Sequence, residues 1–335
     1  MKLIIQLPCL DEAESLPTTL AALPREVDGF DTVEWLIIDD GSTDGTADIA
    51  RACGIDHVVT HTKNLGLARA FMSGLSHCLE LGADVIVNTD ADNQYDARDI
   101  PTLTAPILRG EADMVIGARP IEDVEHFSAI KKLLQRLGSR VVRMASKTEI
   151  TDAPSGFRAI SRSAALRINV FSEYTYTLET IIQAGQRNIA TTSVPVRTNP
   201  DMRPSRLFKS IPQYLLRSML TIIRIFVVYK PFASFVTVGS LLLCGGALIG
   251  VRYLYFLTIG ESGGHVQSLI LASLLIGIGI QTILIGFVAD LLSVNRKLLE
   301  ELKFRQLEDR LSHQHKETEL QSHPIPAEKS EKPAG

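Results

Sequence analysis

The first 120 residues alternate short apolar runs with amphipathic stretches. Five apolar runs, 3–8, 34–40, 57–61, 84–89 and 113–118, have the length and residue types of β-strands. Helix-like segments follow the first three runs, at 12–23, 41–53 and 66–82. Alternation of strands and helices predicts an α/β domain with a mostly parallel sheet and helices on both faces.

Polar residues gather where three of these strands end, in segments 8–12, 39–42 and 90–94. Ligands of open parallel sheets bind at the carboxyl ends of the strands. We therefore expect the three segments to line one crevice and to form the functional site of the domain.

Two later segments, 232–251 and 268–289, contain no charged residue. Each is long enough to cross a hydrocarbon core of about 30 Å as a helix. The alternative is a pair of buried helices in a soluble protein. Basic residues flank the pair, whereas the linker 252–267 has Arg252 as its only lysine or arginine. Since basic flanks mark the cytoplasmic side, the pattern predicts two spans with both flanking regions cytoplasmic. The flanking basic residues are Arg203, Arg206, Lys209, Arg217, Arg224, Lys230, Arg296, Lys297, Lys303 and Arg305.

Two more segments have the spacing of amphipathic helices. Segment 209–230 is too charged to span and is expected to lie in the headgroup region as an interfacial helix. Segment 127–146 has a basic face that includes Arg136, which is either a solvated surface or a site for an anion. The predicted organisation is a cytosolic domain at 1–208, the interfacial helix at 209–230, two spans within 231–290, and a cytosolic helix with a disordered tail at 291–335.

Composition excludes some classes of protein. The net charge of −4 lacks the basic excess expected for nucleic-acid binding. The four cysteines are scattered without metal-ligand spacing, so we expect reduced thiols. The first 14 residues are more typical of a first β-strand than of a signal peptide.

The segment that follows the fourth strand contains Asp90-Ala91-Asp92. Two carboxylates at close range repel each other and raise each other's pKa, unless a cation lies between them. Mg²⁺ accepts one or two protein carboxylates together with phosphate oxygens of a substrate. An Asp-x-Asp triplet is a weak signal by itself, but it becomes specific after an apolar strand and together with the upstream sequence IIDDGSTDGT.

Together these motifs resemble the family 2 glycosyltransferases of the GT-A (Rossmann-like) fold, and among them the dolichyl- and polyprenyl-phosphate sugar synthases. The resemblance covers about residues 3–290. It rests on LPCLDEAESL, WLIIDDGSTDGTADIA, KNLGLARAFMSGL, NTDADNQY, VIGAR, DAPSGFRAISRSAA and RPSRLFKS.

The resemblance implies roles for individual residues. The nucleotide sugar would be bound by Pro8, Glu12, Asp39, Asp40, Asp90 and Ala91, and Mg²⁺ or Mn²⁺ by Asp90, Asp92 and Gln94. The acceptor phosphate would meet Arg119, Arg136, Arg203 and Arg206, with Asp92, Asp152 and Arg119 as the catalytic set.

Two acidic residues have alternative interpretations. Asp11 departs from the family motif, which has Asn at this position, and is expected to cap the following helix. Asp152 could orient the acceptor, support an arginine or cap a helix, and the sequence leaves these roles open. Leu10 replaces the aromatic residue of the family motif.

These observations predict an inverting, metal-dependent transfer of a hexose from a UDP- or GDP-sugar to polyprenyl phosphate at the cytoplasmic membrane face. One alternative is a glycosyltransferase with a diacylglycerol or glycan acceptor, and another is a non-catalytic nucleotide-binding scaffold. Contact with membrane lipids is expected. Glycines of the spans suggest packing with neighbours in a homo-oligomer; they are Gly239, Gly245, Gly246, Gly277, Gly279 and Gly286.

Overall fold

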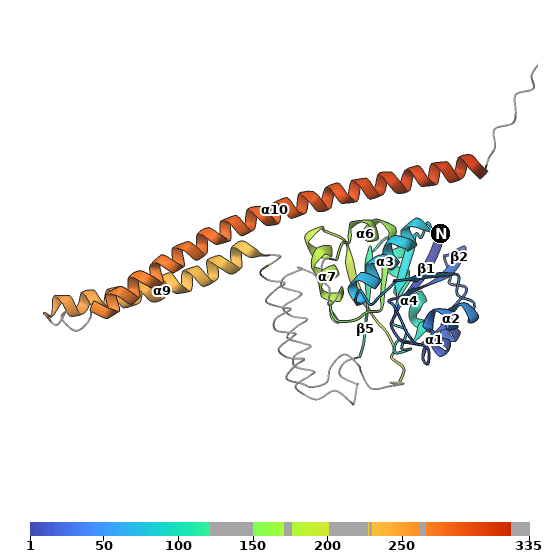
Figure 1. Cartoon of the computed structure of the whole chain (residues 1–335), viewed down its shortest axis with the longest axis horizontal. Coiled ribbons are helices and arrows are strands. Elements are labelled where there is room, and N and C mark those ends of the chain that lie inside the picture. Colours follow the sequence, from blue (N-terminus) through green and yellow to red (C-terminus); the bar gives the residue numbers. More distant parts are fainter. Residues whose placement is uncertain (121–149, 171–175, 201–226, 228–229, 261–265, 323–335) are drawn as a thin grey trace, which may run out of the picture.

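The computed structural model describes residues 1–120, 150–170, 176–200, 227, 230–260 and 266–322 (Figure 1). The helix expected at 127–146, most of the interfacial helix at 209–230, and three of the predicted acceptor residues lie outside this part of the chain. Those three residues are Arg136, Arg203 and Arg206.

A mixed sheet forms the centre of the N-terminal domain, and its strand order in the described residues is β3-β2-β1-β4-β6-β5-β7. β6 is antiparallel to both of its neighbours, while the other strand pairs are parallel. The predicted mostly parallel sheet is therefore confirmed, although β6 and β7 were not anticipated. The strands are β1 Lys2–Cys9, β2 Thr32–Asp39, β3 His57–Thr60, β4 Val85–Asn88, β5 Met114–Ala118, β6 Arg158–Ser161 and β7 Thr191–Pro195.

Helices cover both faces of the sheet, which explains why β1 and β4 are buried almost throughout. One apolar cluster lies under α1, α2 and α4, and a second lies under α3, α6 and α7. The helices are α1 Leu16–Ala22, α2 Thr46–Ala52, α3 Leu67–Glu80, α4 Ile100–Leu108, α6 Arg162–Arg167 and α7 Thr177–Gln186, and a short 3-10 turn, Ala97–Asp99, precedes α4.

Both predicted spans lie in long helices, α9 Pro231–Thr258 and α10 Val266–Ser322. Segments Pro231–Thr258 and Val266–Arg296 are long and apolar enough to cross a membrane. Their apolar side chains are largely exposed, and Leu241 and Leu248 reach 69% and 72% exposure. A buried helix pair in a soluble protein would not expose such a surface, so the structure favours the spanning interpretation.

α9 and α10 pack against each other as a hairpin that extends to one side of the domain (Figure 1). Beyond its apolar segment α10 continues as a helix to Ser322 and contacts α6. The helix lies in the first part of segment 291–335, for which a helix and a disordered tail are predicted, while residues 323–335 lie outside the described chain.

Candidate active site

The three polar segments leave the sheet at the same edge, because β1 lies between β2 and β4. Cys9 pairs with Asp39 on β2, and Gln6 pairs with Asn88 on β4. The chain continues from these ends into segments 8–12, 39–42 and 90–94. The prediction that these three segments lie at one edge of the sheet is therefore confirmed.

Hydrogen bonds join the loop after β1 to the loop after β2. The Asp11 N–H donates to Ser42 Oγ at 2.9 Å, and the Glu12 N–H donates to Thr46 Oγ1 at 3.0 Å. In the other direction, Asp11 Oδ1 accepts from the Thr43 N–H at 2.8 Å. Bonds in both directions hold the two loops as one unit beside Pro8 and Glu12.

The expectation that Asp11 caps the following helix is wrong. The N-cap of α1 is Ser15, four residues further on, and α1 has no side-chain cap. Asp11 has a positive φ of 52°, and its carboxylate turns to the Thr43 N–H instead. A short polar side chain tolerates this left-handed backbone and can bond locally, which suits Asp as well as the Asn of the related motif.

Asp39 and Asp40 are both buried at the end of β2 but bind different segments. Asp39 Oδ1 accepts from the Ser42 N–H at 3.0 Å. Asp40 accepts from the backbone N–H groups of Leu65 and Gly66 at 2.9 and 2.8 Å, and from His61 Nδ1 at 2.7 Å. The Asp40 carboxylate thus holds the loop before α3. These are the same oxygens that the resemblance assigned to nucleotide binding.

The Asp90-Ala91-Asp92 segment is held by its neighbours. Thr19 Oγ1 on α1 donates to the Ala91 carbonyl at 2.8 Å, and the Gln94 N–H donates to Asp92 Oδ1 at 3.0 Å. Burial raises the pKa of Asp90 to about 7, and the charges of Asp92 and Glu12 act in the same direction, whereas Arg119 and Arg158 oppose the shift.

This donor set fits a hard divalent cation that also binds a substrate diphosphate. Mg²⁺ is typically held by one or two carboxylates plus phosphate oxygens, and Asp90 and Asp92 supply the two carboxylates. Among the described residues, no group of three or more His, Cys, Asp or Glu side chains is arranged to hold a metal ion. A cation bound here would complete its coordination with oxygens from water or from a substrate.

Arg119, the residue directly after β5, supplies a positive charge to the site. Its Nε and one terminal nitrogen donate to the two oxygens of Asp152, at 2.8 and 3.1 Å. The Asp152 side chain is 1% exposed and that of Arg119 is 15% exposed. The sequence left open whether Asp152 orients the acceptor, supports an arginine or caps a helix. Its contacts with Arg119 support the second role. No helix begins at Asp152, which argues against the third.

Several residues beneath the site were not identified from the sequence. Asn88 Nδ2 donates to the Gly156 carbonyl and to the Tyr176 hydroxyl, both at 2.9 Å. The Tyr95 hydroxyl accepts from the Gly156 N–H at 3.1 Å. Arg158, in β6, is fully buried. Four of these residues lie in motifs of the resemblance, Asn88 and Tyr95 in NTDADNQY and Gly156 and Arg158 in DAPSGFRAISRSAA, but no spacing in those motifs indicated what the residues contact.

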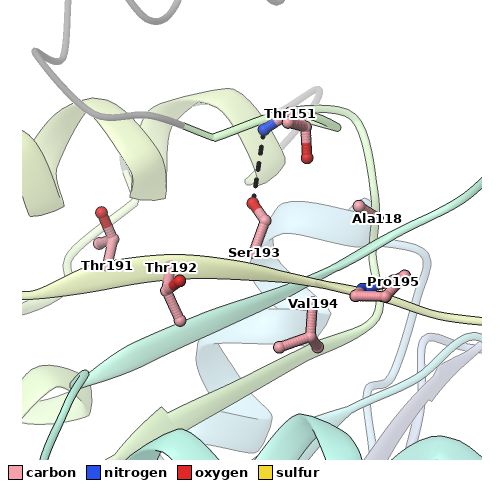
Figure 2. A pocket seen from close by; sticks show the side chains of 7 residues that line it. All are labelled: Ala118, Thr151, Thr191, Thr192, Ser193, Val194 and Pro195. Carbon is pink, nitrogen blue, oxygen red and sulfur yellow. Dashed lines mark hydrogen bonds between the residues drawn. The ribbon is translucent and has the colours of Figure 1, made fainter.

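A cavity of about 370 Å³ lies beside β7, the last strand in the sheet order, and its lining does not include Asp90 or Asp92 (Figure 2). The Thr151 N–H donates to Ser193 Oγ at 3.4 Å across this cavity. Its lining has both hydroxyl and methyl groups. Arg119 and Asp152 do not line it, but the residues that precede them, Ala118 and Thr151, do. The lining residues are Ala118, Thr151, Thr191, Thr192, Ser193, Val194 and Pro195.

The chain is similar to a known family and to known proteins. The model of the family "Glycosyl transferase family 2" matches residues 4–168. The undecaprenyl-phosphate mannosyltransferase of Micrococcus luteus is 33% identical over 48% of this chain and 66% of that protein. A UDP-N-acetylglucosamine–dolichyl-phosphate N-acetylglucosaminyltransferase of Methanococcus voltae is 30% identical over 49% of this chain and 73% of that protein.

Among solved structures, glucosyl-3-phosphoglycerate synthase from Mycobacterium tuberculosis, in complex with Mn²⁺, UDP and glucosyl-3-phosphoglycerate, has a similar fold. The TM-score is 0.53 at 21% identity, over 68% of this chain and 78% of that one. This likeness supports the predicted fold class.

Proposed function

The chain belongs to glycosyl transferase family 2, and we propose that it transfers a hexose from a nucleotide diphosphate sugar to the phosphate of a polyprenyl lipid. Relatives named for undecaprenyl-phosphate and dolichyl-phosphate acceptors support this acceptor class. The two helices that could span a membrane support a lipid acceptor as well.

The observation that carries the proposal is the pairing of an acidic half and a cationic half in one site. Asp90 and Asp92 follow β4, and the Arg119–Asp152 pair follows β5. The loop that begins at Asp152 lies against Asp90, since a Cβ on its Gly156 would be 3.0 Å from both Asp90 oxygens. The charge of Arg119 also acts against the rise in the Asp90 pKa. A reaction between two phosphorylated substrates needs both kinds of group.

In the donor half, the joined loops after β1 and β2 would bind the nucleotide through Pro8, Glu12 and Asp39. Asp40 would act here by fixing the loop before α3, which it holds through two backbone N–H groups. Asp90 and Asp92, with Gln94 beside them, would hold Mg²⁺ or Mn²⁺. Such a cation supplies Lewis-acid stabilisation of the departing diphosphate.

In the acceptor half, Arg119 would bind the lipid phosphate. A guanidinium has five N–H donors, of which Asp152 takes two in a bidentate pair that fixes its plane. Arg136, Arg203 and Arg206 remain predicted acceptor residues from the sequence.

The reaction needs little proton transfer. A phosphate monoester has a second pKa near 6 and is mostly dianionic at neutral pH. One of its oxygens forms a bond to the anomeric carbon while the bond from that carbon to the diphosphate oxygen breaks. Attack opposite the leaving group inverts the configuration. The residues of this chain therefore act by orienting two anions and offsetting their repulsion.

Incubation of the purified protein with radiolabelled UDP- and GDP-hexoses, Mg²⁺ or Mn²⁺, and undecaprenyl phosphate tests the proposal. We expect label in an acid-labile lipid fraction. Label in diacylglycerol alone would contradict the acceptor class. Tight nucleotide binding without transfer to any acceptor would contradict the enzymatic function and favour a scaffold.

A further inference from the structure

Arg158 occupies the centre of the sheet directly beneath the site. It is the first residue of β6, which lies between β4 and β5. Its backbone is in register with Asn88 on one side and with Ile116 on the other. The side chain is 0% exposed.

Two of the side-chain hydrogen bonds of Arg158 go to one loop, and a third goes to α7. Nε donates to the Ser155 carbonyl at 2.8 Å, and one terminal nitrogen donates to the Ala153 carbonyl at 2.9 Å. The other terminal nitrogen donates to Thr180 Oγ1 on α7. One guanidinium therefore ties residues 153–155 to β6 and to α7.

Such a residue is costly at this position. Transfer of a charge from water to a protein interior is unfavourable unless polar partners compensate for it. Burial accordingly lowers the pKa of the Arg158 guanidinium, which still remains charged at neutral pH. The rest of the sheet interior is mainly apolar, so a buried arginine here calls for a reason beyond packing.

The loop that Arg158 holds joins the two halves of the site. At its start, Asp152 receives the bidentate contact of Arg119. Near its end, Gly156 lies so close to Asp90 that a Cβ there would be 3.0 Å from both carboxylate oxygens. The loop thus contacts the cationic half at one end and the acidic half at the other.

We infer that Arg158 is a positioning residue, which holds the 152–157 loop so that the Arg119–Asp152 pair and the Asp90 carboxylate keep a fixed separation. The inference rests on the proposed function for its effect on turnover. The hold on the loop itself does not depend on that function. The charge of Arg158 acts on Asp90 at a distance, but the hydrogen bonds above go to the loop and to α7, so Arg158 fixes the geometry of the site through the loop.

Thr180→Val tests this role, because it removes the hydroxyl that accepts from Arg158 while it keeps the side-chain shape. Thr104→Val is a matched control. Both threonines are fully buried in helices and donate to carbonyls three and four residues earlier, but Thr104 lies on α4, on the other face of the sheet. The cost of losing a buried helical hydroxyl is common to the two variants.

We expect kcat of Thr180→Val to fall about tenfold relative to Thr104→Val, because misplacement of reacting groups by a fraction of an ångström slows the chemical step. The donor KM should change by less than about threefold, since the side-chain hydrogen bonds of Arg158 in the described chain go to Ser155, Ala153 and Thr180 and not to the loops after β1 and β2. Arg158→Lys should also have a lower kcat than the wild-type protein, because one ammonium cannot reproduce a planar guanidinium that donates to two carbonyls. Equal kcat in the two threonine variants, or wild-type kcat in Arg158→Lys, would overturn the inference.

Hydrogen exchange separates this inference from the proposed function. The Gly156 N–H, bonded to the Tyr95 hydroxyl, should exchange at least about tenfold faster in Thr180→Val than in Thr104→Val, as in local opening. Equal exchange in a peptide covering 150–158 would refute the positioning role even in an inactive protein. Faster exchange without any transfer by the wild-type protein would leave the positioning role standing and refute only the reaction.

Discussion

At the residue scale, the site depends on a small residue as much as on charged ones. Gly156 has no side chain, and a Cβ there would be 3.0 Å from both Asp90 oxygens and from the Tyr176 hydroxyl. Any larger residue would push against the Asp90 carboxylate. The position of Asp90 therefore depends on a glycine that is 66 residues away in the chain.

Asp92→Asn should reduce transfer by on the order of 100-fold, since it removes one of two charges available to a cation that stabilises the leaving group. Folding should be unaffected, because an asparagine oxygen can still accept from the Gln94 N–H. Transfer rates and melting temperatures measure the two effects. Asp48→Asn, at an 85% exposed side chain on α2, is the control. A wild-type rate in Asp92→Asn would contradict the metal role.

The pKa of Asp90, raised to about 7, predicts that metal binding depends on pH. A cation competes with the proton on this carboxyl, so affinity should rise as pH increases through 7 and level off above it. Mn²⁺ should bind about tenfold more weakly at pH 6 than at pH 8. Titration of the protein with Mn²⁺, followed by electron paramagnetic resonance, measures this difference, and equal affinities would show that Asp90 is no ligand.

At the scale of elements, the antiparallel strand β6 sets the width of the site. β4 carries the acids at its carboxyl end and β5 carries Arg119, and β6 lies between them. Adjacent strands are about 4.8 Å apart, so the two carboxyl ends are about 10 Å apart. An inserted strand thus leaves room for a diphosphate and a sugar between the acidic and cationic halves.

The α9–α10 hairpin has its own small-residue contact. A Cβ on Gly239 would be 2.8 Å from the Gly279 carbonyl oxygen, and one on Gly279 would be 2.9 Å from that of Gly239. Gly246 and Gly286 also lie against the other helix of the same chain. These four glycines serve packing within one chain. Only Gly245 and Gly277 of the six expected at an oligomer interface have open space around them, and the homo-oligomer stays a prediction.

Gly239→Leu should separate α9 from α10, because the added side chain overlaps the Gly279 backbone. Overpacking of this kind costs about 1–3 kcal/mol. Gly245→Leu is the control, since a Cβ there meets nothing within 4 Å. Thermal unfolding in detergent compares the two, and equal melting temperatures would contradict the close packing of these helices.

At the scale of the molecule, two helices that each crossed a membrane would return the chain to the side from which it came. The domain precedes α9, and the end of α10 passes α6 of that domain (Figure 1). With the basic flanks, this arrangement supports a cytoplasmic domain and cytoplasmic chain ends. The site would then lie where nucleotide sugars are found, close to the headgroups of the lipid acceptor.

Cysteine labelling tests this topology. A membrane-impermeant maleimide should label the exposed Cys53 from the cytoplasmic side alone, and Thr258→Cys, at the end of α9, from the opposite side alone. Cys244 lies within α9 and should resist the reagent from either side. Intact and inverted vesicles provide the two sides. Labelling of both sites from one side would exclude the two-span arrangement.

Local patterns in the sequence correctly predicted the five strands β1 to β5 and the positions of both apolar helices. Each of these elements carries its own signal, as a run of apolar residues with a definite length and period. β6 and β7 are short strands with polar residues, such as Thr191 and Arg158, and have no such signal. They become strands because their edges pair with β4 and β5.

The sequence by itself determined the fold class, the strand ends that carry the polar residues, and the likeness to a family of transferases. Only the tertiary structure decided which polar side chains bind each other. Asp11 binds the Thr43 N–H, Asp152 binds Arg119, and Arg158 binds the loop between them. The physical reason is that a hydrogen bond depends on distance and direction between groups far apart in the chain, which residue type and spacing along the chain do not specify.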